Sequence, residues 1–202
     1  MGKLIVFEGI DGSGKSTQAK LLQGFWQIDF PRYDHIFGKI IKWLLHQRWG
    51  QKVNPYFLAW LFATDRLLAK PKICGLLNPG KNVAVDRYTG SSQAHQGAKF
   101  SGPKRQKIIN WIDWLERRFY RLPQPDHVFF LKVKPQITRQ LIAKRGRKKD
   151  AAEKDLAHQQ ETFAVYQQLA KINGWHIINS LDERGQLVAP KKIHESIQAK
   201  IS

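Results

Sequence analysis

The feature that most constrains this chain is a glycine-rich segment, Gly9–Ser16, which matches the pattern G-x-x-x-x-G-K-[ST] at every fixed position. An apolar run precedes it and a helical pattern follows from Thr17 to about Phe25, so the segment joins a buried strand to a helix. Glycines let the backbone curl until its N–H groups and the helix N-terminus face phosphate oxygens. We expect Lys15 to reach the β- and γ-phosphates and the Ser16 hydroxyl to ligate Mg²⁺. The predicted ATP or GTP site comprises Gly9, Ile10, Asp11, Gly12, Ser13, Gly14, Lys15, Ser16 and Thr17.

Short apolar runs alternate with helical patterns along the rest of the chain. Near-continuous apolar strands are typical of a parallel sheet covered on both faces, and the alternation predicts a doubly wound α/β domain. We therefore expect a three-layer sandwich of the P-loop NTPase type, with a five-stranded parallel sheet flanked by helices and a mobile lid at about 144–154. A single domain is expected to span 1–202. The predicted strands are 3–7, 26–30, 82–86, 127–133 and 175–179.

Two helices can be placed by their patterns. Asn54 and Pro55 suit the N-cap and the first position of a helix that runs to about Lys70. A second helix carries a core stripe at Ile108, Ile112, Leu115 and Phe119, and the last helix carries another at Ile193, Ile197 and Ile201.

The amino-acid composition limits the kinds of partner that the protein can bind. The 202 residues carry 34 Lys and Arg against 16 Asp and Glu, a net charge of +18 that attracts anions. Nucleic acid is a possible partner, but the sequence shows no zinc-ligand spacing and no RRM-like aromatic signature, so nucleic-acid binding is not predicted. Cys74 is the only cysteine, and no apolar run is long enough to span a membrane. These observations indicate a reducing, cytoplasmic setting without a membrane partner.

A phosphate-binding loop does not by itself distinguish a kinase from a GTPase or a motor, so the other motifs decide. Together, and in this order, the following stretches resemble those of the thymidylate kinase family: Phe7–Thr17, Phe30–Tyr33, Leu61–Arg66, Asp86–Gly97, Pro123–Asp126 and Arg145–Lys149. The resemblance covers almost the whole chain. It implies transfer of the ATP γ-phosphate to dTMP to give dTDP and ADP, with Mg²⁺ as cofactor and a homodimer as the assembly.

The resemblance also implies roles for individual residues. Lys15, Arg87, Arg147 and Asp11 are the implied catalytic residues, Arg145 stacks on adenine, and Ser16 and Asp86 lie at the metal. Arg32 and Arg87 are the implied ligands of the acceptor 5′-phosphate. The implied dTMP-binding residues are Asp11, Arg32, Tyr33, Phe62, Arg66, Arg87, Ser91, Ser92, His95 and Gln96.

Some of these roles agree with chemistry read from the residues alone. Phe62 and Arg66 lie four apart and share a helix face, where a ring can stack on a base and a guanidinium can donate to a carbonyl such as thymine O4. The alternative is a core phenylalanine beside an arginine that extends to solvent. Arg87 follows Asp86 at the end of a strong strand, where ligands bind in open α/β sheets. The resemblance implies that Asp86 acts near the metal or holds Arg87 in place, and the alternative is a plain structural aspartate.

The chain departs from the family pattern at several positions. His95 stands where the family commonly has a tyrosine that packs against the deoxyribose, which puts strict deoxyribose selectivity in doubt. The phosphate loop has no arginine, and family members of this kind carry the catalytic arginine in the lid, for which Arg147 is our choice. Glu153 aligns with a lid glutamate, although Ala152 replaces the usual aromatic residue before it.

Other functions remain open from sequence alone. The rivals are a P-loop kinase with a different nucleotide or nucleoside acceptor, a basic nucleic-acid-binding P-loop protein, and a degenerate paralogue with a regulatory role. Trp111 and Trp114 lie off the core stripe of their helix, where they could form a subunit interface or pack beneath a loop.

Overall fold

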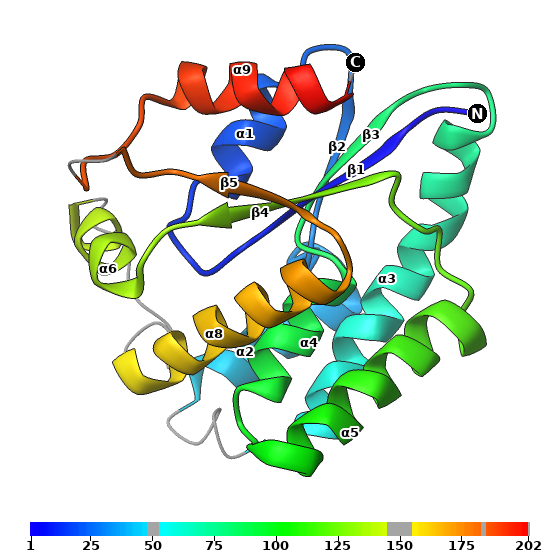
Figure 1. The fold of residues 1–202 in the computed structure, drawn as a ribbon. Coiled ribbons are helices and arrows are strands. Elements are labelled where there is room, and N and C mark those ends of the chain that lie inside the picture. The colour runs from blue at the N-terminus through cyan, green and yellow to red at the C-terminus, as the bar shows by residue number, and fades with distance from the viewer. Residues whose placement is uncertain (48–52, 145–154, 183–184, 202) are drawn as a thin grey trace.

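The computed structural model describes residues 1–47, 53–144, 155–182 and 185–201. Its centre is a five-stranded parallel sheet in the order β2-β3-β1-β4-β5 (Figure 1). The prediction of a five-stranded parallel sheet is confirmed, and each strand lies within one residue of its expected ends. The strands are β1 (Leu4–Glu8), β2 (Trp26–Asp29), β3 (Val83–Asp86), β4 (His127–Lys132) and β5 (His176–Asn179).

Helices cover both faces of the sheet, because successive side chains of each strand point to opposite sides. Leu4 and Val6 pack with α3, whereas Ile5 and Phe7 pack with α1 and α9. Figure 1 shows α1 and α9 on one side and α3, α4, α5 and α8 on the other, which confirms the three-layer sandwich. The helical segments are α1 (Lys15–Leu21), α2 (Ile36–His46), α3 (Pro55–Leu77), α4 (Thr89–Gly97), α5 (Gly102–Asp113), the π-helical turn η2 (Trp114–Phe119), α6 (Pro135–Lys144), α8 (Leu156–Ile172) and α9 (Pro190–Ile201).

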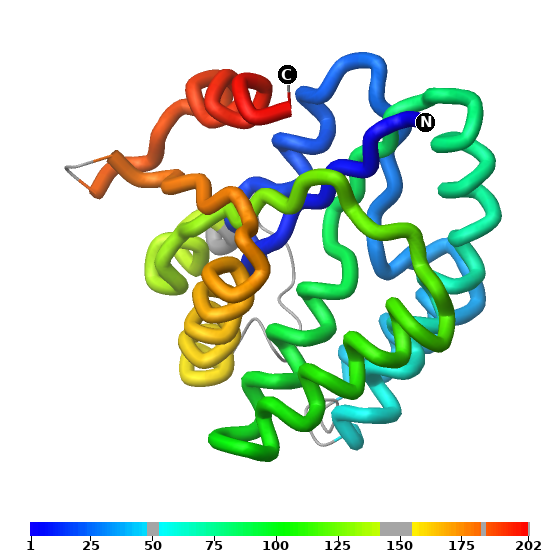
Figure 2. The backbone as a smooth tube through the Cα atoms, turned by 45° about the vertical axis from the view of Figure 1, so that its right-hand side comes forward, coloured from blue at the N-terminus to red at the C-terminus, as the bar shows by residue number. Residues whose placement is uncertain are grey.

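The strand order places three loops at one edge of the sheet. β3 lies between β2 and β1, and Asp86 is in register with both Asp29 and Phe7. The segments that follow these three strands therefore leave the sheet side by side. Both chain ends lie together on the opposite side of the molecule, where Lys3 Nζ donates to the Ile201 carbonyl (Figure 2).

Two helices end elsewhere than the sequence predicts. α1 stops at Leu21, before Gly24 turns the chain in a left-handed conformation (φ 77°). α3 continues beyond Lys70 to Leu77 and contains Pro71. Ile73 and Leu77 are buried in the core beside β1 and β3, and this burial outweighs the helix-breaking tendency of the proline.

The predicted core stripe at Ile108–Phe119 is correct for its first three members and wrong for Phe119, whose side chain is 64% exposed. The helix changes its hydrogen bonding at η2, and the Tyr120 N–H donates to the Leu115 carbonyl five residues back at 2.8 Å. A π-helical turn holds more residues than an α-helical turn, so the side chains that follow rotate away from the stripe.

The remaining expectations for helices hold. Ile193 and Ile197 are buried in the last helix. In the ranges that the structure describes, no helix combines the length and the apolar character needed to cross a bilayer.

Pro71 provides a test of the fold. It is exposed and lacks the N–H that would donate to the Leu67 carbonyl, so we expect Pro71→Ala to raise the free energy of unfolding by about 1–3 kcal/mol. Urea unfolding followed by circular dichroism measures the change. The neighbouring exposed change Lys72→Ala is the control and is expected to stay within about 0.5 kcal/mol of the parent. A Pro71→Ala protein no more stable than the parent would contradict a continuous α3.

Candidate active site

The segment Gly9–Gly14 leaves β1 in a conformation that its glycines make possible. Gly9, Gly12 and Gly14 have φ values of 145°, 80° and 95°, in the left-handed region that disfavours side chains. A Cβ at Gly9 would lie 2.9 Å from the Leu131 carbonyl oxygen, so a side chain there would clash with the strand beside it. Because α1 begins at Lys15, its N-terminal N–H groups face the loop and favour an anion there.

Lys15 is buried inside the curve of this loop. Its Nζ donates to the Ile10 carbonyl at 2.9 Å, so the backbone of the loop holds the amine. Burial, followed by repulsion from Arg87, lowers the pKa of Lys15 to about 8. A bound anion would remove this disadvantage of the charged amine, so the loop favours phosphate over an uncharged ligand.

Asp11 faces Arg87, and this contact explains how an acidic residue is tolerated in a loop that binds anions. Arg87 directly follows β3 with φ 71°, and its Nη2 forms an ion pair with Asp11 Oδ1. Its Nη1 donates to Ser91 Oγ at 3.2 Å and to His95 Nε2 at 3.3 Å. Burial would raise the pKa of Asp11, but Arg87 and Lys15 outweigh it and hold the carboxyl well below its usual range. The ion pair thus joins the phosphate loop to the end of β3.

A fully buried carboxylate that sequence reasoning missed organises the start of α4. Glu8 accepts hydrogen bonds from the N–H groups of Tyr88 and Ser91, at 2.9 and 3.1 Å, and from Ser91 Oγ at 2.6 Å. Tyr166 of α8 also donates to Glu8, at 3.2 Å. Burial raises the pKa of Glu8 despite these donors. The available signal was an acidic residue that ends an apolar strand directly before the glycine loop.

Arg32 is held in a similar way beside the end of β2. Its main-chain N–H donates to Asp65 Oδ2 at 2.9 Å, and its Nε and Nη2 donate to Asp65 Oδ1 at 3.1 and 3.0 Å. Asp65 is completely buried in α3, so the loop after β2 is fixed to that helix. Tyr33, the next residue, is exposed, and the amine of Lys42 lies 5.9 Å from the centre of its ring.

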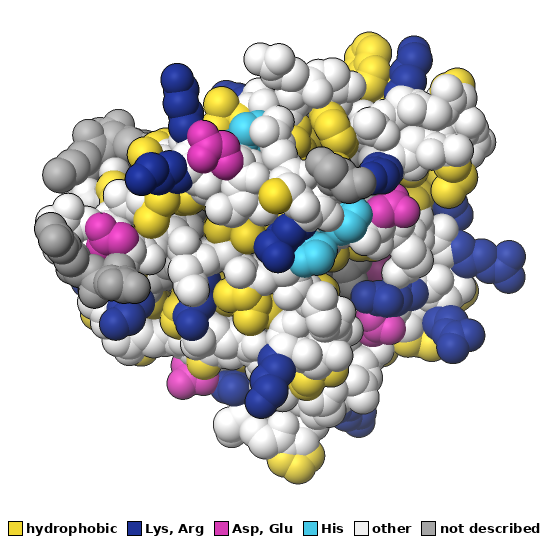
Figure 3. All heavy atoms as spheres, turned by 45° about the horizontal axis from the view of Figure 1, so that its top comes forward, with side chains coloured by type: hydrophobic (Ala, Val, Ile, Leu, Met, Phe, Trp, Pro, Cys, Tyr) yellow, Lys and Arg dark blue, Asp and Glu magenta, His cyan; other side chains and the backbone are white. Residues whose placement is uncertain are grey.

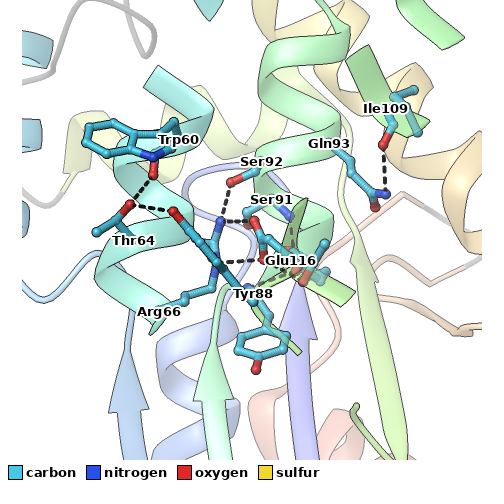
Figure 4. A network of polar contacts seen from close by, with 12 residues as sticks. Trp60, Thr64, Arg66, Tyr88, Ser91, Ser92, Gln93, Ile109 and Glu116 are labelled. Atoms are coloured by element: carbon cyan, nitrogen blue, oxygen red, sulfur yellow. Dashed lines mark hydrogen bonds and ion pairs between the residues drawn. The ribbon is translucent and has the colours of Figure 1, made fainter. Parts of the chain in front are cut away.

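Arg66 does not extend to solvent, so the alternative reading of this residue was wrong. Its side chain is 1% exposed and forms a two-point ion pair with Glu116 of η2, with Nε–Oε2 at 2.9 Å and Nη2–Oε1 at 2.6 Å (Figure 4). Nη2 also donates to Ser92 Oγ at 2.5 Å. Phe62 is partly buried and packs against apolar side chains of α2 and α3. Asp65 and Glu116 were both missed, although Glu116 falls four residues after Ile112 on a stripe that is otherwise apolar.

His95 and Gln96 are the last predicted site residues on α4. The His95 ring meets the Tyr166 ring edge-on at 6.1 Å, and burial followed by the Arg87 charge lowers the pKa of His95 well below its usual value. Gln96 is buried, and its Oε1 has no hydrogen-bond partner within the described residues.

The expected metal residues lie at the same edge of the sheet. Ser16 is exposed at the start of α1, and Asp86 Oδ1 at the end of β3 is buried without a hydrogen-bond partner in the described part of the chain. Carboxylate and hydroxyl oxygens are donors that Mg²⁺ prefers, so the unpartnered oxygen fits a hydrated metal ion. The described ranges contain no group of three or more His, Cys, Asp or Glu that could form a protein-only metal cage.

The predicted lid residues fall in a part of the chain that the structure does not describe. Arg145, Arg147, Lys148, Lys149 and Glu153 lie outside the described residues.

Comparison with known proteins agrees with this geometry. The family model for thymidylate kinase matches residues 7–189. A curated thymidylate kinase of Mycobacterium tuberculosis (strain ATCC 25618 / H37Rv) is 33% identical over 187 residues, which cover 85% of this chain and 87% of the relative. The Homo sapiens thymidylate kinase is 32% identical over 180 residues, with 84% and 77% covered. The solved structure of thymidylate kinase from Candida albicans matches with a TM-score of 0.78 at 26% identity, covering 99% of this chain and 91% of that one.

A family match over nearly the whole chain, together with a phosphate loop that pairs with the arginine at the end of β3, leads to one conclusion: the chain belongs to the thymidylate kinase family.

Proposed function

We infer that this chain is a dTMP kinase, which transfers the γ-phosphate of ATP to dTMP and releases dTDP and ADP. The observation that carries this inference is the position of Arg87. Its guanidinium is held against the phosphate loop by Asp11, so a cation suited to an acceptor phosphate lies beside the donor phosphates.

The proposed mechanism is positioning together with charge neutralisation. A phosphate monoester has its second pKa near about 6 and is mostly dianionic at pH 7, so the acceptor needs no general base. Lys15 is proposed to hold the donor phosphates, and Arg87 and Arg32 to hold the acceptor phosphate. Mg²⁺, held by Ser16 and Asp86, would supply positive charge to the donor phosphates. Asp65 and Asp11 orient the two arginines and so support this arrangement.

The acceptor base is proposed to lie between α3 and α4. Phe62 stacks on the base, Arg66 donates to its 4-oxo group, and Ser92 and Gln96 line the pocket. The burial of Arg66 supports this role, because the N–H donors of a guanidinium at the surface would form hydrogen bonds to water. His95 and Asp11 are proposed to face the sugar, with Ser91 and Tyr33 nearby.

The lid is also a proposal. Arg147 is proposed to neutralise charge on the transferring phosphoryl group, since mobile cations serve this purpose in phosphoryl transfer. Arg145 is proposed to stack on adenine. Closure of such a lid would exclude water and suppress ATP hydrolysis.

The excess positive charge fits nucleotide attraction better than nucleic-acid binding. On the face seen in Figure 3, Lys and Arg side chains are scattered and Asp and Glu side chains lie among them. A duplex or single strand is usually bound along a continuous basic stripe.

A cytoplasmic location is proposed as well, supported by the single cysteine, Cys74.

We further propose that the protein is a homodimer, joined through α2 and α3. Large apolar side chains are exposed on these neighbouring helices, and the Trp60 ring contacts those of Phe37 at 6.1 Å and Phe57 at 5.9 Å. Apolar surface of this kind commonly marks a subunit interface. Trp111 instead packs on Tyr56 of its own chain, with ring centres 5.1 Å apart. The exposed residues are Ile36, Ile40, Trp43, Phe57 and Trp60.

An acceptor panel tests the function. With ATP and Mg²⁺ present, we expect dTMP to stimulate ADP release strongly and UMP to do so weakly. Lys15→Ala and Arg87→Ala are each expected to reduce this turnover by about three orders of magnitude or more, because each removes charge stabilisation of the transferred group. ADP release that needs no acceptor, or near-normal turnover in either variant, would show the assignment to be wrong.

Phe62 provides a test of the base site. Phe62→Ala is expected to raise the KM for dTMP by about tenfold or more and to leave the KM for ATP within about twofold, since stacking on one base is worth about 1–3 kcal/mol. Leu68→Ala, an exposed change on the same helix, is the control. An equal rise in both KM values for Phe62→Ala would indicate a core residue.

The dimer is tested with a matched pair of tryptophans. Trp43 is 58% exposed on α2, and Trp26 is 50% exposed on β2. We expect Trp43→Glu to shift the protein from dimer to monomer in sedimentation experiments, because a buried unpaired charge opposes association. Trp26→Glu is expected to leave the dimer intact. A dimer that survives Trp43→Glu places the interface elsewhere.

A further inference from the structure

Glu116 is a carboxylate with no contact to solvent, and it meets Arg66 inside the molecule (Figure 4). Both of its oxygens are used. Oε1 accepts from Arg66 Nη2, and Oε2 accepts from Arg66 Nε and from Thr89 Oγ1 at 2.8 Å. Taking two charges out of water is costly, and such a pair is maintained when its geometry and hydrogen bonds are complete, as they are here.

The same contacts determine which part of Arg66 remains available. A guanidinium has five N–H donors in a planar fork. Glu116 and Ser92 engage Nε and Nη2. No acceptor for Nη1 is found among the described residues. The two N–H groups of Nη1 are therefore the donors that remain available to a ligand, and they form the free edge of the fork.

The backbone around Glu116 is fixed as well. The Glu116 carbonyl accepts from the Leu122 N–H at 2.9 Å, and the π-helical hydrogen bond from Tyr120 to Leu115 closes beside it. Turns of this kind recur at functional sites. Three segments, α3, α4 and η2, therefore converge on one guanidinium.

We propose that Glu116 is a positioning residue for base selection: it locks Arg66 so that the Nη1 donors face the 4-oxo group of the acceptor base. The proposal rests on the proposed function, in which Arg66 contacts that base. An arginine without this partner can turn its fork toward other acceptors, and it then loses discrimination between a 4-oxo group, which accepts a hydrogen bond, and a 4-amino group, which donates one.

The experiment uses two acceptors that differ at position 4. These are dTMP and 5-methyl-dCMP, in which an amino group replaces the 4-oxo oxygen and the neighbouring N3 loses its hydrogen. Glu116→Gln keeps the size of the side chain and removes its charge. It is expected to raise the KM for dTMP by about tenfold or more, to leave the KM for ATP within about twofold, and to lower the kcat/KM preference for dTMP over 5-methyl-dCMP by a similar factor.

The control is Asp113→Asn, which breaks the exposed ion pair with Arg117 on the adjoining helical turn and is expected to change none of these values. Thermal unfolding establishes that each variant is folded at the assay temperature. Should Glu116→Gln not fold, Thr89→Val decides the question. It removes one donor to Glu116 and is expected to raise the KM for dTMP by about twofold to fivefold.

The outcomes separate the two levels of inference. The positioning role is overturned if the folded Glu116→Gln protein keeps the parent KM and the parent preference for dTMP. Thr89→Val is judged in the same way if Glu116→Gln does not fold. Glu116 would then serve only to connect the helices. Arg66→Gln tests the proposed function itself, in which Arg66 contacts the acceptor base. If it too leaves the KM for dTMP unchanged, Arg66 does not contact the base and the proposed base site fails. A raised KM in Arg66→Gln beside an unchanged KM in Glu116→Gln overturns the positioning role alone.

Discussion

The placement of β3 between β2 and β1 is the constraint on which the rest of the site depends. Parallel pairing aligns Asp86 with Asp29 and with Phe7, so the three strands end level with one another. The phosphate loop and Arg87 are then neighbours in space although they are distant in sequence, and the segment that carries Arg32 leaves the sheet on the same side. The continuous apolar run of β1 packs into a helix-covered core on each face of the sheet, and this close packing holds the strand ends in place.

Charge pairing is the second common element. Arg32, Arg66 and Arg87 each have a carboxylate partner from another segment, namely Asp65, Glu116 and Asp11. In a chain with a net charge of +18, an unpaired buried arginine would be repelled by its surroundings as well as poorly solvated. Pairing offsets the cost of burying these cations, so three guanidinium groups can lie inside a strongly basic protein.

Local patterns predicted the strands and the phosphate loop well, because apolar runs and glycine spacing act within a few residues. They failed where long-range packing decides. Burial of Ile73 and Leu77 carries α3 through Pro71, and the π-helical turn moves Phe119 to the surface. The sequence predicted Arg87 at the end of a strand, where the structure has it, but Asp65, Glu116 and Glu8 were not foreseen, because a lone acid in a sequence does not reveal its partner. The predictions for Arg145 and Arg147 stay predictions.

The ion pair between Asp11 and Arg87 has a consequence for how this protein can change over generations. The two residues lie 76 positions apart, and each supplies the charge that lets the other remain in the site. Loss of the acid alone would leave the arginine free to compete for donor phosphates, whereas loss of the arginine alone would leave a carboxylate facing them. Drift at either position is therefore constrained by the other, and the pair is expected to be inherited or replaced as a unit.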